Sequence, residues 1–235
     1  MRKIRYNVIR FPGSNCDDDA HWVAGLFDGA EAEYVWHKDT QLKSPDVVIV
    51  PGGFSYGDYL RCGAIAKFSH IMAEVVKFAG KGGLVICICN GFQILTEVGL
   101  LPGALLMNNS LHFICQHQHV RVENNSTPFS NLFSPQEVAD FPIAHKEGNY
   151  YIDEIGLKKL IDNRQIVFRY SDPKGELTSD ANPNGSVHSI AGIVNEKGNV
   201  LGMMPHPERA SEAILSSEKG AKVFLSINKW LNECS

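Results

Sequence analysis

The sequence predicts an α/β protein built on a mixed, mostly parallel β-sheet with helices on both faces. In the first half, short apolar runs bounded by Gly and Pro alternate with segments of helical spacing, which indicates parallel β–α–β units. In the second half, two apolar runs flank the turn Asn195-Glu196-Lys197-Gly198, which predicts an antiparallel hairpin. The 235 residues are expected to form a single domain over residues 1–235.

The first half provides the expected parallel strands and their helices. Apolar runs that end at Gly, Pro or a polar turn predict strands over residues 6–11, 32–36, 47–50 and 84–88. Apolar residues at helical spacing predict helices over residues 20–27, 65–78 and 92–98. Ser14 or Asn15 is expected to cap the first of these helices, because both side chains accept hydrogen bonds from free helical N–H groups.

The second half is expected to add the antiparallel part of the sheet. Residues 111–123 are interpreted as a pair of strands and residues 141–144 as a short extended segment. Further strands are expected over residues 166–170, 189–194 and 200–204, and helices over residues 153–161 and 219–231.

Composition and charge exclude several classes of function. The chain has 22 Lys and Arg against 26 Asp and Glu, so it lacks the basic excess that favours nucleic-acid binding. No apolar run approaches the ~20 residues of a membrane span. Residues 1–6 are basic, but no long apolar stretch follows them, so no export signal is expected. We therefore expect a cytoplasmic protein whose six cysteines are reduced thiols.

The segment from Val85 to Gln93 carries the first candidate for catalysis. A predicted buried strand runs directly into a predicted helix with Cys89 at the corner, which is typical of a nucleophile elbow. The helix N-terminus stabilises a thiolate, the nucleophilic form of cysteine. The alternative is a small core cysteine at a strand end. Cys87 faces the same side of the strand, and the Asn90-Gly91 turn favours Cys89 as the nucleophile.

A second candidate segment follows the last predicted strand. His206 lies between Pro205 and Pro207, which hold the chain in an extended turn. Glu208 is two residues further, so in an extended segment its carboxylate can reach the imidazole. Such a pair forms an oriented base for a nearby thiol. The alternative is a surface histidine in a proline-rich loop.

A third candidate segment follows the predicted strand over residues 47–50. Gly52 and Gly53 allow backbone N–H groups to point into a cleft. We expect an oxyanion hole there, with Gly53 or Phe54 and the Asn90 amide as donors. For the glycines alone, an ordinary turn at a strand end is the alternative.

These segments lie at strand ends, where open α/β sheets place their sites, and they resemble the class I glutamine amidotransferases. The matching motifs are Cys89-Asn90-Gly91-Phe92-Gln93, Pro51-Gly52-Gly53-Phe54-Ser55-Tyr56-Gly57-Asp58 and Pro205-His206-Pro207-Glu208-Arg209. Residues 11–16, 121–124, 182–186 and 189–193 resemble, within that class, the glutaminase subunits of phosphoribosylformylglycinamidine synthase.

The resemblance implies a flavodoxin-like fold and a Cys89–His206–Glu208 triad that hydrolyses glutamine to glutamate and ammonia through a cysteine thioester. Gln93 lies one helical turn after the proposed nucleophile, so it is a candidate for contacting the substrate; a helix-surface glutamine is the alternative.

The resemblance also implies partners. A large synthetase subunit would use ATP and the delivered ammonia to convert formylglycinamide ribonucleotide to its amidine, and a small third subunit is expected in the same assembly. This chain has no Walker A pattern, so ATP and Mg are expected on the synthetase, with no cofactor and no metal in this chain.

Two positions depart from the pattern of such families. Cys87 stands where a glycine is usual, and a bulkier residue there is expected to loosen the elbow. Lys146 replaces the first glycine of a His-Gly-Glu-Gly pattern, and it would be strained if that residue lies in a left-handed turn.

Two other functions remain open from the sequence. A thiol hydrolase or stress protein with the same elbow commonly has His directly after the nucleophile, where this chain has Asn90. A non-catalytic scaffold subunit is the other. Cys115, His117 and His119 alternate on one strand face, but neighbouring same-face residues are a poor tetrahedral set, so a polar strand face is favoured over a zinc site.

Overall fold

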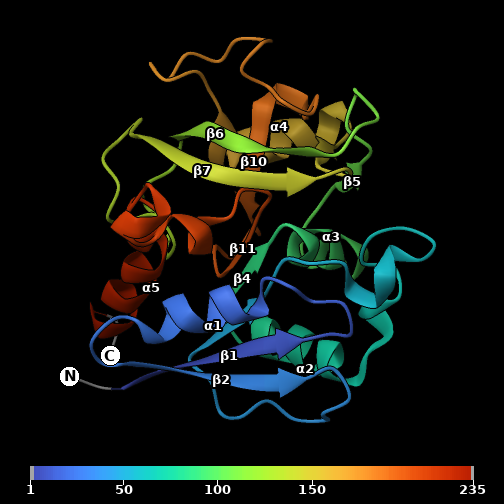
Figure 1. Ribbon diagram of the computed structural model, residues 1–235, viewed down its shortest axis with the longest axis vertical. Coiled ribbons are helices and arrows are strands. Elements are labelled where there is room, and N and C mark those ends of the chain that lie inside the picture. Colours follow the sequence, from blue (N-terminus) through green and yellow to red (C-terminus); the bar gives the residue numbers. More distant parts are fainter. Residues whose placement is uncertain (1–2, 234–235) are drawn as a thin grey trace.

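The computed structural model describes residues 3–233, so Met1, Arg2, Cys234 and Ser235 lie outside the described residues. A nine-stranded mixed sheet runs through them in the order β2-β1-β3-β4-β11-β10-β9-β6-β7 (Figure 1). Its strands are β1 (Ile4–Arg10), β2 (Ala30–Trp36), β3 (Val47–Val50), β4 (Leu84–Ile88), β6 (Ile114–Val122), β7 (Val138–His145), β9 (Ile166–Tyr170), β10 (Ile190–Val194) and β11 (Val200–Met203). A separate antiparallel pair joins β5 (Ala104–Leu106) to β8 (Asn149–Tyr151), which the sequence analysis did not predict.

The sheet has a parallel part and an antiparallel part. The strands β2, β1, β3, β4 and β11 run parallel to one another, which confirms the mixed and mostly parallel sheet. The pairings from β11 through β10, β9 and β6 to β7 are all antiparallel. Figure 1 shows β1 and β2 of the parallel part at the bottom and β6 and β7 toward the top, with β4 and β11 between them.

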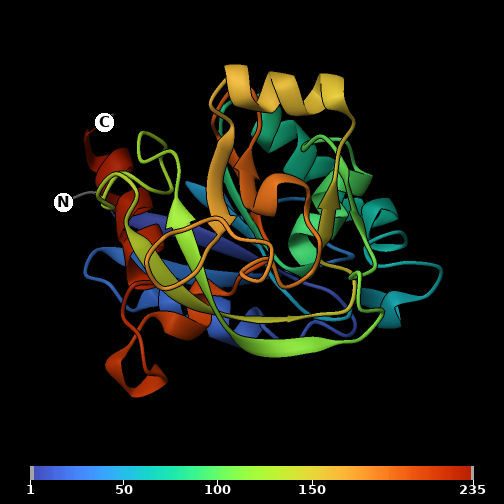
Figure 2. The same cartoon turned by 90° about the horizontal axis from the view of Figure 1, so that it is seen from above.

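Helices cover both faces of the parallel part, as expected. The helices are α1 (Asp17–Gly25), α2 (His70–Gly80), α3 (Asn90–Glu97), α4 (Glu154–Asp162) and α5 (Ala221–Glu233). Helices α1 and α5 lie on one face of the parallel part, and α2 and α3 lie on the other (Figures 1 and 2). Every residue of β3 and β4 is buried, which is typical of a parallel strand covered on both sides.

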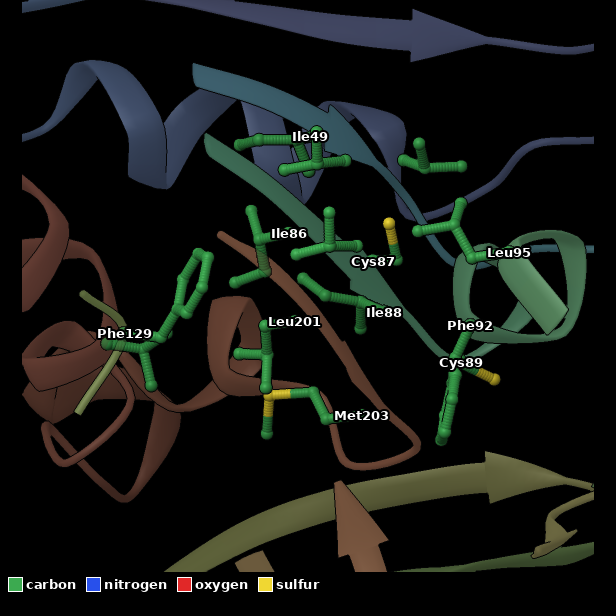
Figure 3. Packing of buried hydrophobic residues seen from close by; sticks show 14 of the residues in the cluster. Ile49, Ile86, Cys87, Ile88, Cys89, Phe92, Leu95, Phe129, Leu201 and Met203 are labelled. Carbon is green, nitrogen blue, oxygen red and sulfur yellow. The ribbon is translucent and has the colours of Figure 1, made fainter. Parts of the chain in front are cut away.

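The core lies where β4 meets its neighbours. Ile49 of β3, Ile86 of β4, Leu95 of α3 and Leu201 of β11 belong to one apolar cluster (Figure 3). Burial of such side chains contributes roughly 1.5–3 kcal/mol each, so the strand that leads to Cys89 is firmly held. Within the described residues, no helix is long and apolar enough to cross a membrane.

The structure confirms the boundaries of the strands over residues 47–50, 84–88 and 166–170, and it confirms the β10–β11 hairpin. The pair of strands expected over residues 111–123 is wrong. That region contains one strand, β6, which pairs with β7 from Ile114 to Arg121, because no turn-forming Gly or Pro interrupts it.

Two smaller expectations also fail. The first helix is capped by neither Ser14 nor Asn15; Cys16 occupies the N-cap position and makes no side-chain cap hydrogen bond. The helix expected over residues 65–78 is divided at Ser69, whose extended backbone separates a short 3₁₀ turn from α2.

Candidate active site

Cys89 occupies the sharp turn between β4 and α3. Its backbone has φ 51° and ψ −105°, a region that residues other than glycine rarely adopt. The turn at this corner is therefore strained, as in a nucleophile elbow. The Cys89 N–H donates to the Met203 carbonyl at 2.8 Å, and the Cys89 carbonyl accepts from the Phe92 N–H at 2.9 Å. These two bonds fix the turn from the sheet side and from the helix side.

Gly91 explains how the helix can begin so close to the sheet. A Cβ atom at this position would collide with the carbonyl of Val50 in β3. Only glycine allows the first turn of α3 to lie directly against that strand. Glycine at position 91 is therefore required by the packing of α3 against β3 as well as by the elbow turn.

Cys87 and Cys89 lie in different surroundings in the structure. The Cys87 thiol is completely buried among apolar side chains, and this burial raises its pKa well above the usual value. Figure 3 shows its sulfur within the cluster, whereas the Cys89 sulfur at the end of the strand points away from it. Cys89 lines a cavity. These positions favour Cys89 as the reactive thiol.

His206 and Glu208 form a buried pair directly after β11. The His206 Nδ1 atom lies 2.6 Å from Glu208 Oε1. The His206 N–H donates to the Pro142 carbonyl of β7 at 2.9 Å, which ties this turn to the antiparallel part. Glu208 reaches the imidazole through the 3₁₀ turn Pro207–Ala210 rather than through the extended segment that we expected.

The charges around His206 favour its protonated form. Burial alone would lower the pKa of the imidazole, but the Glu208 carboxylate and the Cys89 sulfur outweigh it and raise the pKa well above the usual value. The Nε2 atom, which the Glu208 contact leaves free, has no hydrogen-bond partner among the described protein groups. It can therefore serve a reacting group.

Two of the three expected oxyanion donors, the N–H groups of Gly53 and Asn90, remain candidates. The Phe54 N–H does not. The Phe54 N–H donates to the Gly13 carbonyl at 2.9 Å, so this group is engaged elsewhere. Gly53 has φ 144°, and a Cβ there would lie 2.8 Å from Asn15 N. Asn90 is the first residue of α3, so its N–H has no intrahelical acceptor. Gly53 and Asn90 are thus the candidate donors.

A cavity of about 200 Å³ opens beside Cys89. Its lining residues are Gly53, Phe54, Asp58, Cys62, Cys89, Gln93, Phe113, Ala144, His145, Lys146 and Glu147. Gln93 is buried, so the helix-surface alternative is wrong. Its amide N–H donates to the Glu147 carbonyl at 2.7 Å, and its amide oxygen accepts from Asn90 Nδ2 at 2.9 Å. The Gln93 side chain therefore links the Glu147 segment of the cavity lining to helix α3.

Cys16 is a residue of this site that the sequence analysis missed. Potential ligand atoms of Cys16, His206 and Glu208 lie within 4.8 Å of one another, and all three residues are buried. Gly52 permits this approach, because a Cβ there would lie 2.8 Å from His206 Cε1 and 3.0 Å from Cys16 Sγ. The available signal was position: Cys16 follows β1, another parallel strand that ends at the same edge as β4.

The histidines of β6 lie next to the carboxylate of Asp140 in β7. His117 Nδ1 lies 3.0 Å from Asp140 Oδ2, and His119 Nδ1 lies 3.4 Å from Asp140 Oδ1. Among residues 3–233, Cys115, His117 and His119 do not form a group with ligand atoms within 4.8 Å, whereas Cys16, His206 and Glu208 do.

The two departures from the family pattern are accommodated. Cys87 lies in the apolar cluster beside an elbow that keeps its hydrogen bonds. Lys146 is not among the residues with positive φ, so the left-handed turn that would strain it does not occur. The close approach in this segment falls at Gly148, where a Cβ would collide with the His145 ring.

Comparison with known proteins agrees with this geometry. A model of the family described as "CobB/CobQ-like glutamine amidotransferase domain" matches residues 3–232, so the chain belongs to the glutamine amidotransferases. It is 56% identical over 227 residues to the phosphoribosylformylglycinamidine synthase subunit PurQ of Moorella thermoacetica, with 97% of this chain and 96% of the relative covered. Within the amidotransferases, the chain belongs to the PurQ family.

Two further comparisons support this membership. The PurQ subunit of Synechocystis sp. is 57% identical over 222 residues, which cover 94% of this chain and 99% of the relative. A chain of the solved structure of PurLQS from Thermotoga maritima superposes with a TM-score of 0.86 at 46% identity, covering 97% of this chain and 99% of that chain.

Proposed function

We propose that this chain, as a single amidotransferase domain over residues 1–235, hydrolyses glutamine to glutamate and ammonia for phosphoribosylformylglycinamidine synthase. One observation carries the proposal: the strained Cys89 lines a cavity, and its sulfur is close enough to the buried His206 of the His206–Glu208 pair to raise the pKa of the imidazole. A thiol, an oriented imidazole and nearby backbone donors are the groups that acyl transfer through a thioester needs. The membership in the PurQ family supports the same reaction.

The proposed reaction proceeds in two steps. The Cys89 thiolate attacks the carboxamide carbon of glutamine, and the N–H groups of Gly53 and Asn90 stabilise the oxyanion. The protonated His206 gives its proton to the departing nitrogen, so ammonia leaves and a thioester remains. His206 then takes a proton from water, which attacks the thioester and releases glutamate. Glu208 holds the imidazole in the orientation that both steps need.

The expected partners belong to the same proposal. The name PurLQS describes a solved structure that contains a chain similar to this one, which supports a large synthetase subunit and a small third subunit. ATP and Mg would bind the synthetase, where ammonia converts formylglycinamide ribonucleotide to its amidine. The cytoplasmic location stays a prediction.

We expect docking of the synthetase to change glutaminase turnover through the peptide bond between Gly52 and Gly53. Its carbonyl accepts from the Cys16 N–H at 3.3 Å, and its N–H is the proposed Gly53 donor. Rotation of this peptide would exchange the group that faces the oxyanion. Loss of one such donor costs about 10²- to 10³-fold in turnover. Docking of the synthetase would select the productive orientation.

The test measures glutamate release at saturating glutamine from the lone chain and from the assembled complex. We expect turnover in the complex to exceed that of the lone chain by about 10²- to 10³-fold, the cost of one missing donor. Equal turnover would mean that the Gly53 loop is already productive and that coupling does not act there. Absence of glutamate release from both samples would contradict the proposed function itself.

A further inference from the structure

Cys16 gives the His206–Glu208 pair a third potential metal ligand, which the proposed chemistry does not use. Ligand atoms of Cys16, His206 and Glu208 lie within 4.8 Å of one another, and all three side chains are buried. It is the only group of three or more Cys, His, Asp or Glu residues within residues 3–233 that meets this condition. We propose that these three residues form a binding site for Zn²⁺ and that Zn²⁺ held there inhibits the glutaminase. Zn²⁺ acts in this proposal as an inhibitor and not as a cofactor.

The His206–Glu208 pair contains two buried atoms that remain available to a metal. His206 Nδ1 lies 2.6 Å from Glu208 Oε1, whereas His206 Nε2 and Glu208 Oε2 have no hydrogen-bond partner among the described protein groups. His206 is only 1% exposed and Glu208 only 3%, so water does not cover these atoms. The proposed mechanism gives Nε2 its partner in the reacting groups, but it gives none to Glu208 Oε2. Buried polar atoms are nearly always paired, so the unpaired carboxylate oxygen indicates a further ligand.

Gly52 brings the Cys16 thiol close to the imidazole. A Cβ atom at Gly52 would lie 2.8 Å from His206 Cε1 and 3.0 Å from Cys16 Sγ, so both side chains lie against the same face of this glycine. The Cys16 N–H donates to the Gly52 carbonyl at 3.3 Å, which holds the cysteine backbone in place. The thiol itself donates to Asn15 Oδ1 at 3.1 Å. A thiol is a weak donor, so a metal can replace this bond at little cost.

An ion pair ties together the two segments that carry the ligands. Arg209 Nε lies 3.0 Å from Asp19 Oδ2. Asp19 belongs to the first turn of α1, which begins directly after Cys16, and Arg209 follows Glu208 in the 3₁₀ turn Pro207–Ala210. The ligands are therefore held near one another before a metal arrives, which lowers the entropic cost of binding.

The chemistry of the three side chains suits Zn²⁺. Thiolate, imidazole and carboxylate bind Zn²⁺ at about 2.0–2.3 Å in tetrahedral sites, whose ligand atoms are therefore about 3.3–3.8 Å apart. Separations within 4.8 Å thus need to shorten by at most about 1.5 Å. The Cys16 thiolate and the Glu208 carboxylate together neutralise the double charge of the ion, and water can take the fourth position. Mg²⁺ prefers six oxygen ligands and does not fit this set.

Zn²⁺ at this site takes away the catalytic base. The metal binds thiolate and neutral imidazole, so the thiol proton of Cys16 and the imidazolium proton of His206 pass to solvent. His206 then neither gives a proton to the departing nitrogen nor takes one from water. Cys89 lines the cavity and its sulfur interacts with the imidazole, so Zn²⁺ can reach the site from the cavity. The inhibition rests on the proposed function, whereas the binding of the metal does not.

Co²⁺ provides a direct test of binding to the full-length chain, because it takes the place of Zn²⁺ and absorbs light strongly when a thiolate binds it. The wild type should show a cobalt–thiolate band that excess Zn²⁺ removes. Cys16→Ser keeps a side chain of similar size without a thiolate and should lose the band. Cys89→Ala should keep it, and so should Cys115→Ser, which removes an exposed thiol of β6. A band that persists in Cys16→Ser, or that disappears in Cys89→Ala, would overturn the assignment.

Inhibition is measured as glutamate release from the assembled complex in buffered Zn²⁺, with each variant compared with its own rate in a chelator. Cys16→Ser should raise the Zn²⁺ concentration that halves turnover by at least about 10- to 100-fold, the cost of disturbing even an outer-shell partner of a metal ligand. Cys115→Ser should respond as the wild type does, and Mg²⁺ at the same concentrations should not inhibit. Equal inhibition of the wild type and Cys16→Ser would place the inhibitory metal elsewhere and overturn the proposal.

Two further arms keep the result decisive. If circular dichroism shows that Cys16→Ser does not fold, Cys16→Ala replaces it in both measurements with the same expected losses. If a folded Cys16 variant releases too little glutamate for the inhibition assay, the cobalt band decides. A wild-type complex that releases no glutamate in the chelator contradicts the proposed function, and the cobalt band of the chain still tests the metal site.

Discussion

The parallel and antiparallel parts of the sheet contribute different walls to one cavity. The parallel part presents Cys89 after β4, Gly53 after β3 and Cys16 after β1, and β11 ends next to His206. The antiparallel part contributes the end of β7, where Ala144 to Glu147 line the opposite wall. This difference suggests a division of labour: the groups that react follow parallel strands, and the antiparallel strand β7 contributes cavity lining together with Asp58 after β3.

The division predicts that changes at Cys89 and His206 act on kcat and that changes in the cavity lining at the end of β7 act on KM. The two parts are not independent, because the His206 N–H is held by the Pro142 carbonyl of β7 at 2.9 Å. The Cys89 sulfur also lies 3.6 Å from the Ala144 carbonyl. The predictions below test this division.

The largest effect is expected at the elbow. Cys89→Ala removes the proposed nucleophile and should reduce glutamate release by about 10⁶-fold, the loss seen when a nucleophile is deleted from a triad. Cys87→Ala lies two residues earlier in the core and should retain most activity, with a loss of stability of about 1 kcal/mol. Glutaminase assays on both purified variants in the complex provide the measurement.

Labelling gives an independent control for that comparison. A glutamine-like electrophile should modify Cys89, which lines the cavity, and should leave Cys87 in the apolar cluster unmodified. Peptide mapping after labelling shows which thiol reacted. Label on Cys87 alone, or equal losses from both variants in folded protein, would count against Cys89.

The next effect concerns the pair that orients the imidazole. His206→Ala should lower turnover by about 10⁶-fold, and Glu208→Gln by about 10⁴-fold, because orientation is lost but the imidazole remains. Glu208 raises the pKa of His206, so its removal should also move the alkaline limb of the pH profile to lower pH. Turnover of the wild type and both variants checks the losses, and profiles from pH 6 to pH 10 of the wild type and Glu208→Gln check the shift.

A change in KM without a change in kcat would contradict the proposed role of the pair. The controls are Lys174→Met and Glu176→Gln, whose exposed side chains lie outside the cavity lining. Near-normal turnover in His206→Ala would break the assignment of chemistry to the parallel strand ends.

The sequence was more informative about the parallel part than about the antiparallel part. Strands β3 and β4 are buried on both faces, so they form continuous apolar runs whose limits are visible in the sequence. Strand β6 has a run of polar residues from Gln116 to His119 between apolar ends, and its length is set by pairing with β7, which a local pattern does not reveal. The predicted break within residues 111–123 failed for this reason.

The same limit of local sequence patterns applies to the active site. Cys89, His206 and Glu208 were predictable because each occupies a strand end with a distinctive neighbour, such as Gly91 or the flanking prolines. The engagement of the Phe54 N–H by Gly13 depends on a contact between two loops, so no local pattern predicts it. Cys16 and Glu147 were missed as members of the site, because only tertiary packing brings Cys16 to His206 and Glu147 to the cavity.

The smallest effect tests how the antiparallel wall depends on protonation. His145 at the end of β7 is buried, with Nδ1 3.2 Å from Asn108 Oδ1 and Nε2 3.5 Å from Asn184 Nδ2. Burial, together with the nearby charge of His206, lowers the pKa of His145 to about 4. The neutral imidazole suits this environment, because one nitrogen can donate to the Asn108 oxygen while the other accepts from Asn184.

The lowered pKa makes folding sensitive to acid. Unfolding returns His145 to an ordinary pKa of roughly 6.5, so the unfolded chain binds the proton first as pH falls. This contribution to the free energy of unfolding is complete above pH 6.5 and should fall by about 3 kcal/mol when the pH reaches about 4. His145→Gln keeps a polar side chain that does not titrate, so urea unfolding of the lone chain between pH 7 and pH 4 should show a shallower loss than the wild type. His206→Ala removes one cause of the shift and should give an intermediate slope. Identical slopes in the three proteins would mean that His145 titrates normally and that the antiparallel wall does not sense the charge of the catalytic pair.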